Sequence, residues 1–371
     1  MSDMRSCDVV FVFGTSAELI KLWPLIVDLS AETQTHVLST NQQPVELKVM
    51  CEEFGLRGVV DLRNATRGNL VTRSSVPNWA VVVGWKLLRQ LRLLRQISNS
   101  KNRDVLVIVH GDTMTCLLGA FIGRVARCKV AHVEAGLRSH DWRNPFPEEL
   151  DRVLTARLAQ FHFCPDQVAI DNLTARRGMK INTRGNTSLD TMARIQGQLT
   201  RIEESRPYVL VSLHRAELLS SREILSDTVH QLAKVSEQQR MVMVLDALTK
   251  ESLKSEELLS ILESSSIELM EKMPYPKFLR LVLGAERVVT DSGGLQEECG
   301  FLMIPCLIHR KATERTDGVG STARLSNWEP DEIVKFCSDP ILGDARERQL
   351  ITTHSPTAVI IDALKSTGLV G

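Results

Sequence analysis

Short apolar runs, most of them rich in β-branched residues, recur along this chain, and longer segments with helical periodicity separate them. The runs cover residues 9–13, 36–38, 105–109, 130–133 and 161–164 in the first half, and 208–213, 241–245 and 287–290 in the second. Strands that are apolar on both faces are typical of parallel sheets covered by helices. The alternation therefore predicts an α/β protein with doubly wound parallel sheets.

Two domains are expected. The 371 residues exceed what one hydrophobic core usually organises, and a polar stretch at 196–206 separates the two series of strands. We therefore place an N-terminal Rossmann-like domain at 1–205 and a C-terminal one at 206–371, whose last helix could pack back on the first domain. Two such domains leave a central cleft, where the carboxyl ends of both sheets can face one ligand.

Charge and cysteine usage limit the possible partners. Lys plus Arg and Asp plus Glu each number 45, so no net charge draws the chain to nucleic acid or to an anionic membrane. The first apolar stretch, 9–13, is too short for a signal-peptide core or a membrane span, which favours a cytoplasmic protein. The eight cysteines include no C-x-x-C pair, so we expect neither a zinc ribbon nor disulfides, and we expect most of the thiols in the core.

One helical segment carries a basic stripe, because Lys86, Arg89, Arg92 and Arg95 recur every three residues between leucines. The pattern fits the solvated face of a helix that covers a sheet, which we favour. The alternative is an amphipathic surface for a membrane or an acidic partner.

Strand ends in the first half carry candidate functional groups. The first strand runs into the segment 14–16, a glycine and two hydroxyl residues, which opens a helix whose N–H groups could bind an anion. Lys21, about two turns into that helix, either joins this site or is a surface charge. Asp112 follows a strand and either works chemically at the sheet edge or caps the next helix.

Three further candidates come after the next strand. Glu134 comes directly after it and is either salt-bridged, for example to Arg138, or held for acid–base chemistry. Pro147 suits the first position of a later helix, and the acids after it suit the helix dipole. Glu148 and Arg152, four residues apart, share one face of that helix and could both point into the cleft.

The second half offers a histidine and a glycine-rich turn. His214 ends the strand 208–213 and could contact phosphate or exchange a proton. In the segment 289–298 a strand ends in Ser292 and two glycines before a helix begins, so free N–H groups could cradle a diphosphate. Glu298 could accept hydrogen bonds from sugar hydroxyls. The alternative is a tight turn that serves packing alone.

Other motifs are excluded. The segment 318–323 matches G-x-G-x-x-A, but no apolar run precedes it, so it does not meet the requirements of a dinucleotide fingerprint. No Walker A, H-E-x-x-H or G-x-S-x-G sequence is present, so metal, ATP-hydrolysis and serine-hydrolase chemistry have no support.

These motifs, in this order, resemble the non-hydrolysing UDP-N-acetylglucosamine 2-epimerases, which share the two-Rossmann-domain GT-B fold with many glycosyltransferases. The resemblance spans nearly the whole chain, and its most specific segments are 110–113, 132–138, 147–149, 185–187, 290–298 and 313–315. It implies an isomerase of nucleotide sugars in polysaccharide biosynthesis, a homodimer, and a reaction with no metal or cofactor.

The resemblance also implies a mechanism and its residues. UDP leaves by anti elimination when a base removes the C2 proton, and it then re-adds while a proton reaches the opposite face of C2. The implied catalytic residues are Asp112, Glu134, Glu148 and His214. The implied residues for binding UDP and substrate are Lys21, Arg152, Ser292, Gly293, Gly294, Glu298 and Arg315, most of them in a UDP-binding C-terminal domain.

Three departures from the family pattern bear on this assignment. Ser16 stands where the family's G-T-R-P-E loop has arginine, and serine cannot replace an arginine–phosphate contact worth ~1.5–3 kcal/mol. The segments 40–44 and 246–249 replace family strings that help a second substrate molecule to activate some bacterial members. These departures leave a non-catalytic nucleotide-sugar-binding paralogue open as an alternative. A UDP-sugar glycosyltransferase of the same fold and a hydrolysing epimerase also stay open.

Overall fold

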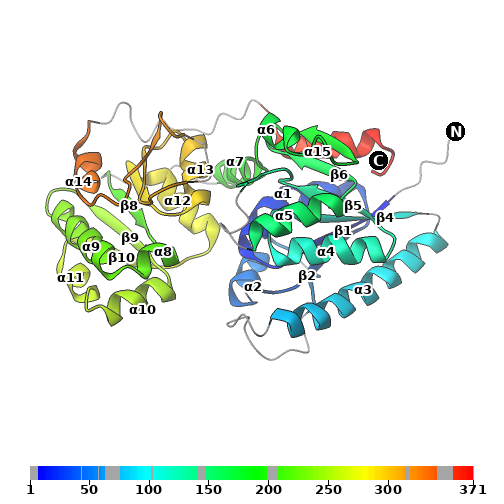
Figure 1. Cartoon of the computed structure of the whole chain (residues 1–371), viewed down its shortest axis with the longest axis horizontal. Coiled ribbons are helices and arrows are strands. Elements are labelled where there is room, and N and C mark those ends of the chain that lie inside the picture. The colour runs from blue at the N-terminus through cyan, green and yellow to red at the C-terminus, as the bar shows by residue number, and fades with distance from the viewer. Residues whose placement is uncertain are drawn as a thin grey trace. The chain divides into compact units, whose positions relative to one another are not determined.

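The computed structural model (Figure 1) describes residues 7–42, 44–56, 58–62, 76–101, 103–140, 147–198, 207–313, 318–340 and 354–370. The chain forms two compact units, one of Met1–Thr191 with Thr352–Gly371 and the other of Met192–Ile351. The boundary expected between residues 205 and 206 lies outside the described residues.

The first unit is built on a seven-stranded sheet in the order β3-β2-β1-β4-β5-β6-β7, with every neighbouring pair parallel. Its strands are β1 (Cys7–Phe13), β2 (Thr35–Ser39), β3 (Val60–Asp61), β4 (Asp104–His110), β5 (Lys129–Val133), β6 (Phe161–Cys164) and β7 (Met179–Asn182). All seven residues of β1 are buried, as a central strand covered on both faces requires.

Helices cover both faces of this sheet (Figure 1). They are α1 (Ser16–Glu32), α2 (Pro44–Glu53), α3 (Val76–Ser100), α4 (Met114–Val125), α5 (Glu148–Leu158), α6 (Gln167–Asp171) and α15 (Pro356–Ser366). Helix α7 (Ser188–Gln198) contains the boundary between the two units, which falls after Thr191. Helices α3 and α4 bury Leu87 and Ala120 in one cluster with Val12 and Val107 of the sheet. The last helix, α15, belongs to the first unit.

The second unit has a six-stranded parallel sheet in the order β10-β9-β8-β11-β12-β13. Its strands are β8 (Val209–Ser212), β9 (Met241–Leu245), β10 (Ile267–Glu271), β11 (Arg287–Thr290), β12 (Cys306–Ile308) and β13 (Ala323–Leu325). Its helices are α8 (Ala216–Leu219), α9 (Arg222–Ser236), α10 (Ala247–Ser255), α11 (Leu259–Ser264), α12 (Tyr275–Gly284), α13 (Gly293–Phe301) and α14 (Asp331–Ser338). The predicted α/β class and parallel sheets are confirmed.

Two expectations about side chains and helices can be checked directly. All eight cysteines are free, and every one but Cys51 is buried, as predicted. Helix α3 buries Leu87 and Leu91 while Arg89 and Arg92 are exposed, which agrees with a helix that covers a sheet. Within the described ranges, no helix has both the length and the apolar character needed to cross a bilayer.

Candidate functional site

The carboxyl ends of β4 and β5 bring Asp112 and Glu134 to one edge of the first unit's sheet. The two strands pair in parallel with His110 beside Val133, so the residues that follow each strand emerge next to one another. Gly111 links the two ends, because its N–H donates to the carbonyl oxygen of Val133 at 3.0 Å. Neighbouring parallel strands thus deliver two carboxylates from positions far apart in the sequence.

Glu134 is held by three polar neighbours. Its Oε1 accepts hydrogen bonds from Lys21 Nζ at 2.8 Å and from Asn186 Nδ2 at 2.5 Å, and its Oε2 lies 3.5 Å from His110 Nε2. The side chain is only 8% exposed, and the backbone has a φ of 60°. A left-handed conformation costs a non-glycine residue roughly 1–3 kcal/mol, and such strain clusters at functional sites. This geometry favours a role for the Glu134 carboxylate in acid–base chemistry.

The partners of Glu134 decide two alternatives left by the sequence. Its ion pair is formed with Lys21, whose side chain is 15% exposed, so interpreting Lys21 as a surface charge is wrong. Arg138 instead donates from Nε to Glu149 Oε1 at 2.5 Å. The suggested Glu134–Arg138 bridge is therefore replaced by two separate ion pairs.

Asp112 is bound by Arg152. Both Nη2 and Nε of the guanidinium group donate to Asp112 Oδ2, at 2.5 and 3.0 Å. The N-cap of α4 is Thr113, whose Oγ1 accepts from the backbone N–H of Cys116 at 3.2 Å. The capping role considered for Asp112 is therefore wrong. Its carboxylate is paired with Arg152 of α5, which the sequence had grouped only with Glu148.

The first turn of α5 adds a structural carboxylate. Glu149 is fully buried and accepts hydrogen bonds from Arg138 and, at 3.0 Å, from the backbone N–H of Ser139. Burial raises the pKa of Glu149, but these donors outweigh it and the pKa is lowered below its usual value. Glu149 also lies 3.6 Å from Nη1 of Arg152, so it holds the arginine in place. Pro147 is the N-cap, one residue before the helical position expected for it.

Asp151 is an acid that the sequence interpretation missed. It is 2% exposed, and in the described chain its Oδ2 has no hydrogen-bond partner. Burial, together with the charges of Asp112 and Glu148, raises its pKa to about 7. Ionisable groups with such shifts cluster at active sites, because proton transfer near neutral pH requires them. Asp151 therefore joins Asp112, Glu134 and Glu148 as a fourth acid in this region.

In the turn between β1 and α1, the side chain of Glu18 accepts the hydrogen bonds of the backbone N–H groups. Glu18 Oε2 accepts hydrogen bonds from the N–H groups of Gly14 at 2.9 Å and Thr15 at 2.8 Å, and Oε1 accepts from Thr113 Oγ1 at 2.6 Å. The sequence offered these N–H groups as a possible anion site, but the buried carboxylate of Glu18 already accepts their hydrogen bonds. The T-x-x-E spacing of a capping box was a signal for this arrangement.

In the second unit, Asp291 anchors the segment that carries His214. Its carboxylate accepts hydrogen bonds from the backbone N–H groups of His214, at 3.1 and 3.0 Å, and of Arg215, at 2.9 Å. Asp291 is 1% exposed, and burial raises its pKa. The imidazole of His214 is 43% exposed, with Nδ1 3.8 Å from Asp291 Oδ1. The backbone is fixed while the ring is available to a ligand.

Helix α13 begins at the glycine-rich turn, as predicted. Ser292 is its N-cap, and Ser292 Oγ accepts from the N–H of Leu295 at 3.5 Å, so this hydroxyl already serves the helix. Gly293 is buried and Gly294 is exposed at the helix start. Glu298 Oε1 accepts a hydrogen bond from the hydroxyl of buried Tyr275 at 2.9 Å. Arg315 lies outside the described residues.

The sequence matches a known family over most of its length. The model of the UDP-N-acetylglucosamine 2-epimerase family matches residues 82–355. The chain belongs to this epimerase family. The membership predicted from the sequence motifs is confirmed, and with it the enzyme class, an isomerase.

Similar proteins and structures carry the same family name. The UDP-N-acetylglucosamine 2-epimerase of Methanocaldococcus jannaschii is 32% identical over 336 residues, which cover 85% of this chain and 86% of the relative. The Escherichia coli enzyme is 29% identical and covers 96% of this chain and 98% of its own. A crystal structure of the M. jannaschii enzyme with UDP-GlcNAc and UDP has a TM-score of 0.73 and 28% identity, covering 97% of this chain and 99% of that one.

Two departures from the epimerase family pattern have a structural explanation. Ser16 is the first residue of α1, and its hydroxyl lies 3.4 Å from Glu46 Oε2, to which it donates a hydrogen bond. Asp246 is the N-cap of α10 and accepts from the N–H of Thr249 at 2.7 Å, so this segment serves a helix cap. Among the described residues, no group of three or more His, Cys, Asp and Glu side chains could hold a metal ion.

Proposed function

We propose that this member of the epimerase family is a UDP-2-acetamido-sugar 2-epimerase that interconverts sugars of the UDP-GlcNAc and UDP-ManNAc type. The observation that carries the proposal is Glu134, a buried carboxylate at a strand end, held in a strained backbone conformation by Lys21 and Asn186. A base that removes a weakly acidic C–H proton must be aimed at one atom, and this arrangement supplies such aim.

The proposed reaction balances without a cofactor. A carboxylate takes the C2 proton, the C–H electron pair forms the C1=C2 bond, and the C1–O electron pair leaves with UDP. A UDP oxygen then attacks C1, and a protonated carboxyl group delivers a proton to the opposite face of C2. Because the proton leaves from one face of C2 and returns to the other, the reaction requires more than one carboxyl group. We propose Asp112, Glu134 and Glu148 for these proton transfers.

Asp151 and Arg152 support these acids in the proposal. Asp151, with a pKa of about 7, can hold or release a proton in the operating range of such an enzyme. Arg152 keeps Asp112 in position through two hydrogen bonds.

The proposed UDP-binding groups lie mainly in the second unit. We assign the diphosphate to N–H groups at the start of α13, around Ser292, Gly293 and Gly294, where the helix dipole favours negative charge. His214, Glu298 and Arg315 are assigned further contacts with UDP, and Lys21 with Arg152 are assigned to the departing diphosphate. Localisation in the cytoplasm and assembly as a homodimer are also part of the proposal.

Deuterium incorporation tests the proposal. Purified protein is incubated with UDP-GlcNAc in deuterated water, and we expect deuterium at C2 together with UDP-ManNAc. A panel of other UDP-acetamido sugars follows if UDP-GlcNAc is inert, and failure with the whole panel would refute the proposal. Free N-acetylmannosamine with UDP identifies a hydrolysing epimerase. Transfer to an added acceptor without C2 exchange identifies a glycosyltransferase, and binding without either reaction identifies a non-catalytic paralogue.

A further inference from the structure

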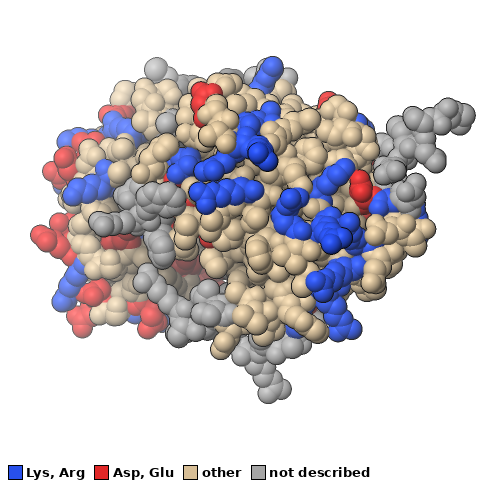
Figure 2. Space-filling model, turned by 45° about the vertical axis from the view of Figure 1, so that its right-hand side comes forward, with Lys and Arg blue, Asp and Glu red and all other residues tan. Residues whose placement is uncertain are grey.

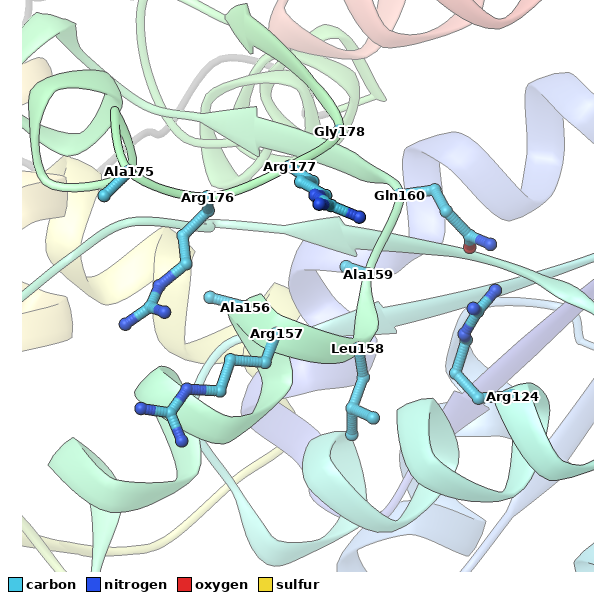
Figure 3. A pocket seen from close by; sticks show the side chains of 10 residues that line it. All are labelled: Arg124, Ala156, Arg157, Leu158, Ala159, Gln160, Ala175, Arg176, Arg177 and Gly178. Atoms are coloured by element: carbon cyan, nitrogen blue, oxygen red, sulfur yellow. The ribbon is translucent and has the colours of Figure 1, made fainter.

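A pocket of about 420 Å³ lies in the first unit, away from the acids (Figure 3). Its walls are the last turn of α4, the last turn of α5 and the segment that follows it, and the loop before β7. Gln160 and Gly178, which line it, directly precede β6 and β7. The pocket is therefore at the amino ends of the strands, whereas Asp112 and Glu134 follow the carboxyl ends of the same parallel sheet.

Arginine dominates the lining. Arg124, Arg157, Arg176 and Arg177 line the pocket, and the lining includes no Asp or Glu. In Figure 3, the side chains of Arg157 and Arg176 extend toward the same flank of the pocket from different segments, and Arg124 rises on the other flank. Within the described part of the chain, none of the four guanidinium groups has a hydrogen bond or an ion pair. Among the residues that the structure describes, four positive charges thus share one hollow without a protein counter-charge in its lining.

Interaction with a helix dipole explains the position of only two of the four arginines. Arg124 and Arg157 lie in the last turns of α4 and α5, where a basic side chain offsets the negative end of the helix. Arg176 and Arg177 come from a loop and have no such role. Adding them to the same pocket increases repulsion among like charges, unless a ligand supplies negative charge.

Basic side chains also gather on one face of the molecule. Figure 2 shows lysine and arginine side chains gathered on the right-hand part of the view, with few acidic side chains among them. Outside the pocket, the exposed Arg89 and Arg92 of α3 carry similar charges, and α3 packs beside α4. These two residues offer a control for general electrostatic attraction, since they do not line the pocket.

We propose that this pocket binds a phosphate-bearing anion of the diphosphate or triphosphate class. Planar guanidinium groups pair with phosphate oxygens through two parallel hydrogen bonds, and four of them match the two to four negative charges of such a group. The volume falls in the range of small-molecule sites. Gln160 contributes a further donor: its Oε1 accepts from the N–H of Val130 at 2.7 Å, which fixes the amide and leaves its NH₂ for a ligand.

Calorimetry with pyrophosphate tests the proposal on the full chain. UDP is present at saturation, so that the diphosphate site proposed at α13 is filled. The pocket variant is Arg157→Gln with Arg176→Gln, and the matched control is Arg89→Gln with Arg92→Gln, which removes the same charge from α3. Each lost charge-assisted contact costs about tenfold in affinity, so we expect roughly a hundredfold weaker binding in the pocket variant. The control should stay within about twofold.

The outcomes separate cleanly. Equal pyrophosphate affinity in the pocket variant and the control overturns the proposal, as does tighter binding of citrate than of pyrophosphate by the unmodified protein. Unchanged thermal unfolding midpoints show that both variants are folded, as expected for side chains that are exposed or half-buried. The site does not depend on the proposed function, because loss of epimerase activity or of UDP binding leaves the comparison of the two variants intact.

The same chemistry occurs in soluble nucleotides and in lipid headgroups, and vesicles distinguish the two sources. Phosphatidylcholine vesicles with and without diacylglycerol pyrophosphate are sedimented with the protein. Binding that requires both this lipid and the pocket arginines identifies a lipid diphosphate. Pyrophosphate binding without vesicle binding identifies a soluble ligand. If neither binds through Arg157 and Arg176, the pocket is not a phosphate site.

Discussion

The candidate groups of the two units are organised in different ways. In the first unit, charged side chains at the sheet edge are paired with opposite charges: Glu134 with Lys21, and Asp112 with Arg152. In the second unit, the groups are backbone N–H groups at the start of α13 and the exposed ring of His214. The charges of the first unit's site are balanced by ion pairs within the protein, whereas the second unit presents hydrogen-bond donors to a ligand.

This difference predicts a catalytic role for the first region and a UDP-binding role for the second. Removing one member of a buried ion pair costs about 3–5 kcal/mol, so Glu134, which pairs with Lys21 and is 8% exposed, is expensive to disturb. Asp112 is 32% exposed, and the cost of disturbing its pair with Arg152 is smaller. Backbone donors at a helix start bind anions whatever the neighbouring side chains are. We therefore expect substitutions of the acids in the first unit to change turnover, and substitutions in the second unit to change affinity for UDP.

The largest effect is expected for Glu134→Gln. The amide keeps the shape of the side chain but cannot take a proton, so C2 deuterium exchange should fall by about 10²–10⁴-fold. UDP affinity, measured by calorimetry, should stay nearly unchanged. Glu53→Gln, an exposed substitution on α2, is the control and should retain full exchange. An equal loss of UDP binding would make Glu134 a structural residue and would break the distinction between the units.

Asp151→Asn should act on stability through pH. The folded-state pKa of about 7 lies above the ordinary value of 3.8, so the folded protein binds the proton more tightly than the unfolded chain. The unfolding free energy therefore falls as pH rises from about 4 to about 7, and this penalty persists above that range. Asn carries no charge, so the variant should be more stable by about 2–4 kcal/mol near pH 8.

Urea unfolding of the Asp151 variant at two pH values makes the measurement. Near pH 4 the gain should vanish, because Asp151 is then protonated in the folded state. A gain of equal size at both pH values would contradict the assigned pKa. Lower C2 exchange in the same, more stable variant would place Asp151 in the proton transfer itself.

A smaller effect is expected for Asp291→Asn in the second unit. The amide cannot accept all the hydrogen bonds that now come from the N–H groups of His214 and Arg215, so the segment carrying His214 should shift. The Michaelis constant should rise about tenfold at nearly constant turnover number, since binding rather than proton transfer is affected. The matched control is Asp246→Asn, because the Asp246 carboxylate also accepts a backbone hydrogen bond in this unit, from the N–H of Thr249. A selective fall in turnover number would argue against the division of roles.

The sequence predicted central strands better than edge strands. Runs such as 105–109 and 241–245 are apolar throughout because helices cover both of their faces. The strands β7 and β10 escaped prediction because each lies at a sheet edge and mixes polar with apolar residues. β12, although internal, has only three residues, too few for a pattern.

For the site as well, the sequence predicted what depends on local position in the chain and missed what depends on tertiary packing. Strand-end logic located Asp112 and Glu134, because parallel strands deliver their following residues to one edge. The partner of Glu134 could not be read from the sequence, since Lys21 is 113 positions away and only the fold joins them. Asp151 was missed because its burial depends on packing. The T-x-x-E spacing signals the capping role of Glu18, but its hydrogen bond from Thr113 depends on the fold.

The smallest effect is expected for Ser16→Arg, which tests whether the first unit lacks a cation for UDP. Lys21 and Arg152 are committed to Glu134 and Asp112, so neither supplies uncommitted charge in the absence of substrate. An arginine at the start of α1 restores the family residue, although Glu46, 3.4 Å from the present hydroxyl, would compete for it. UDP affinity should rise by about three- to tenfold, and further when Glu46→Gln is added. Unchanged affinity in both variants would mean that the second unit alone holds the diphosphate, which would make the contrast between the two regions complete.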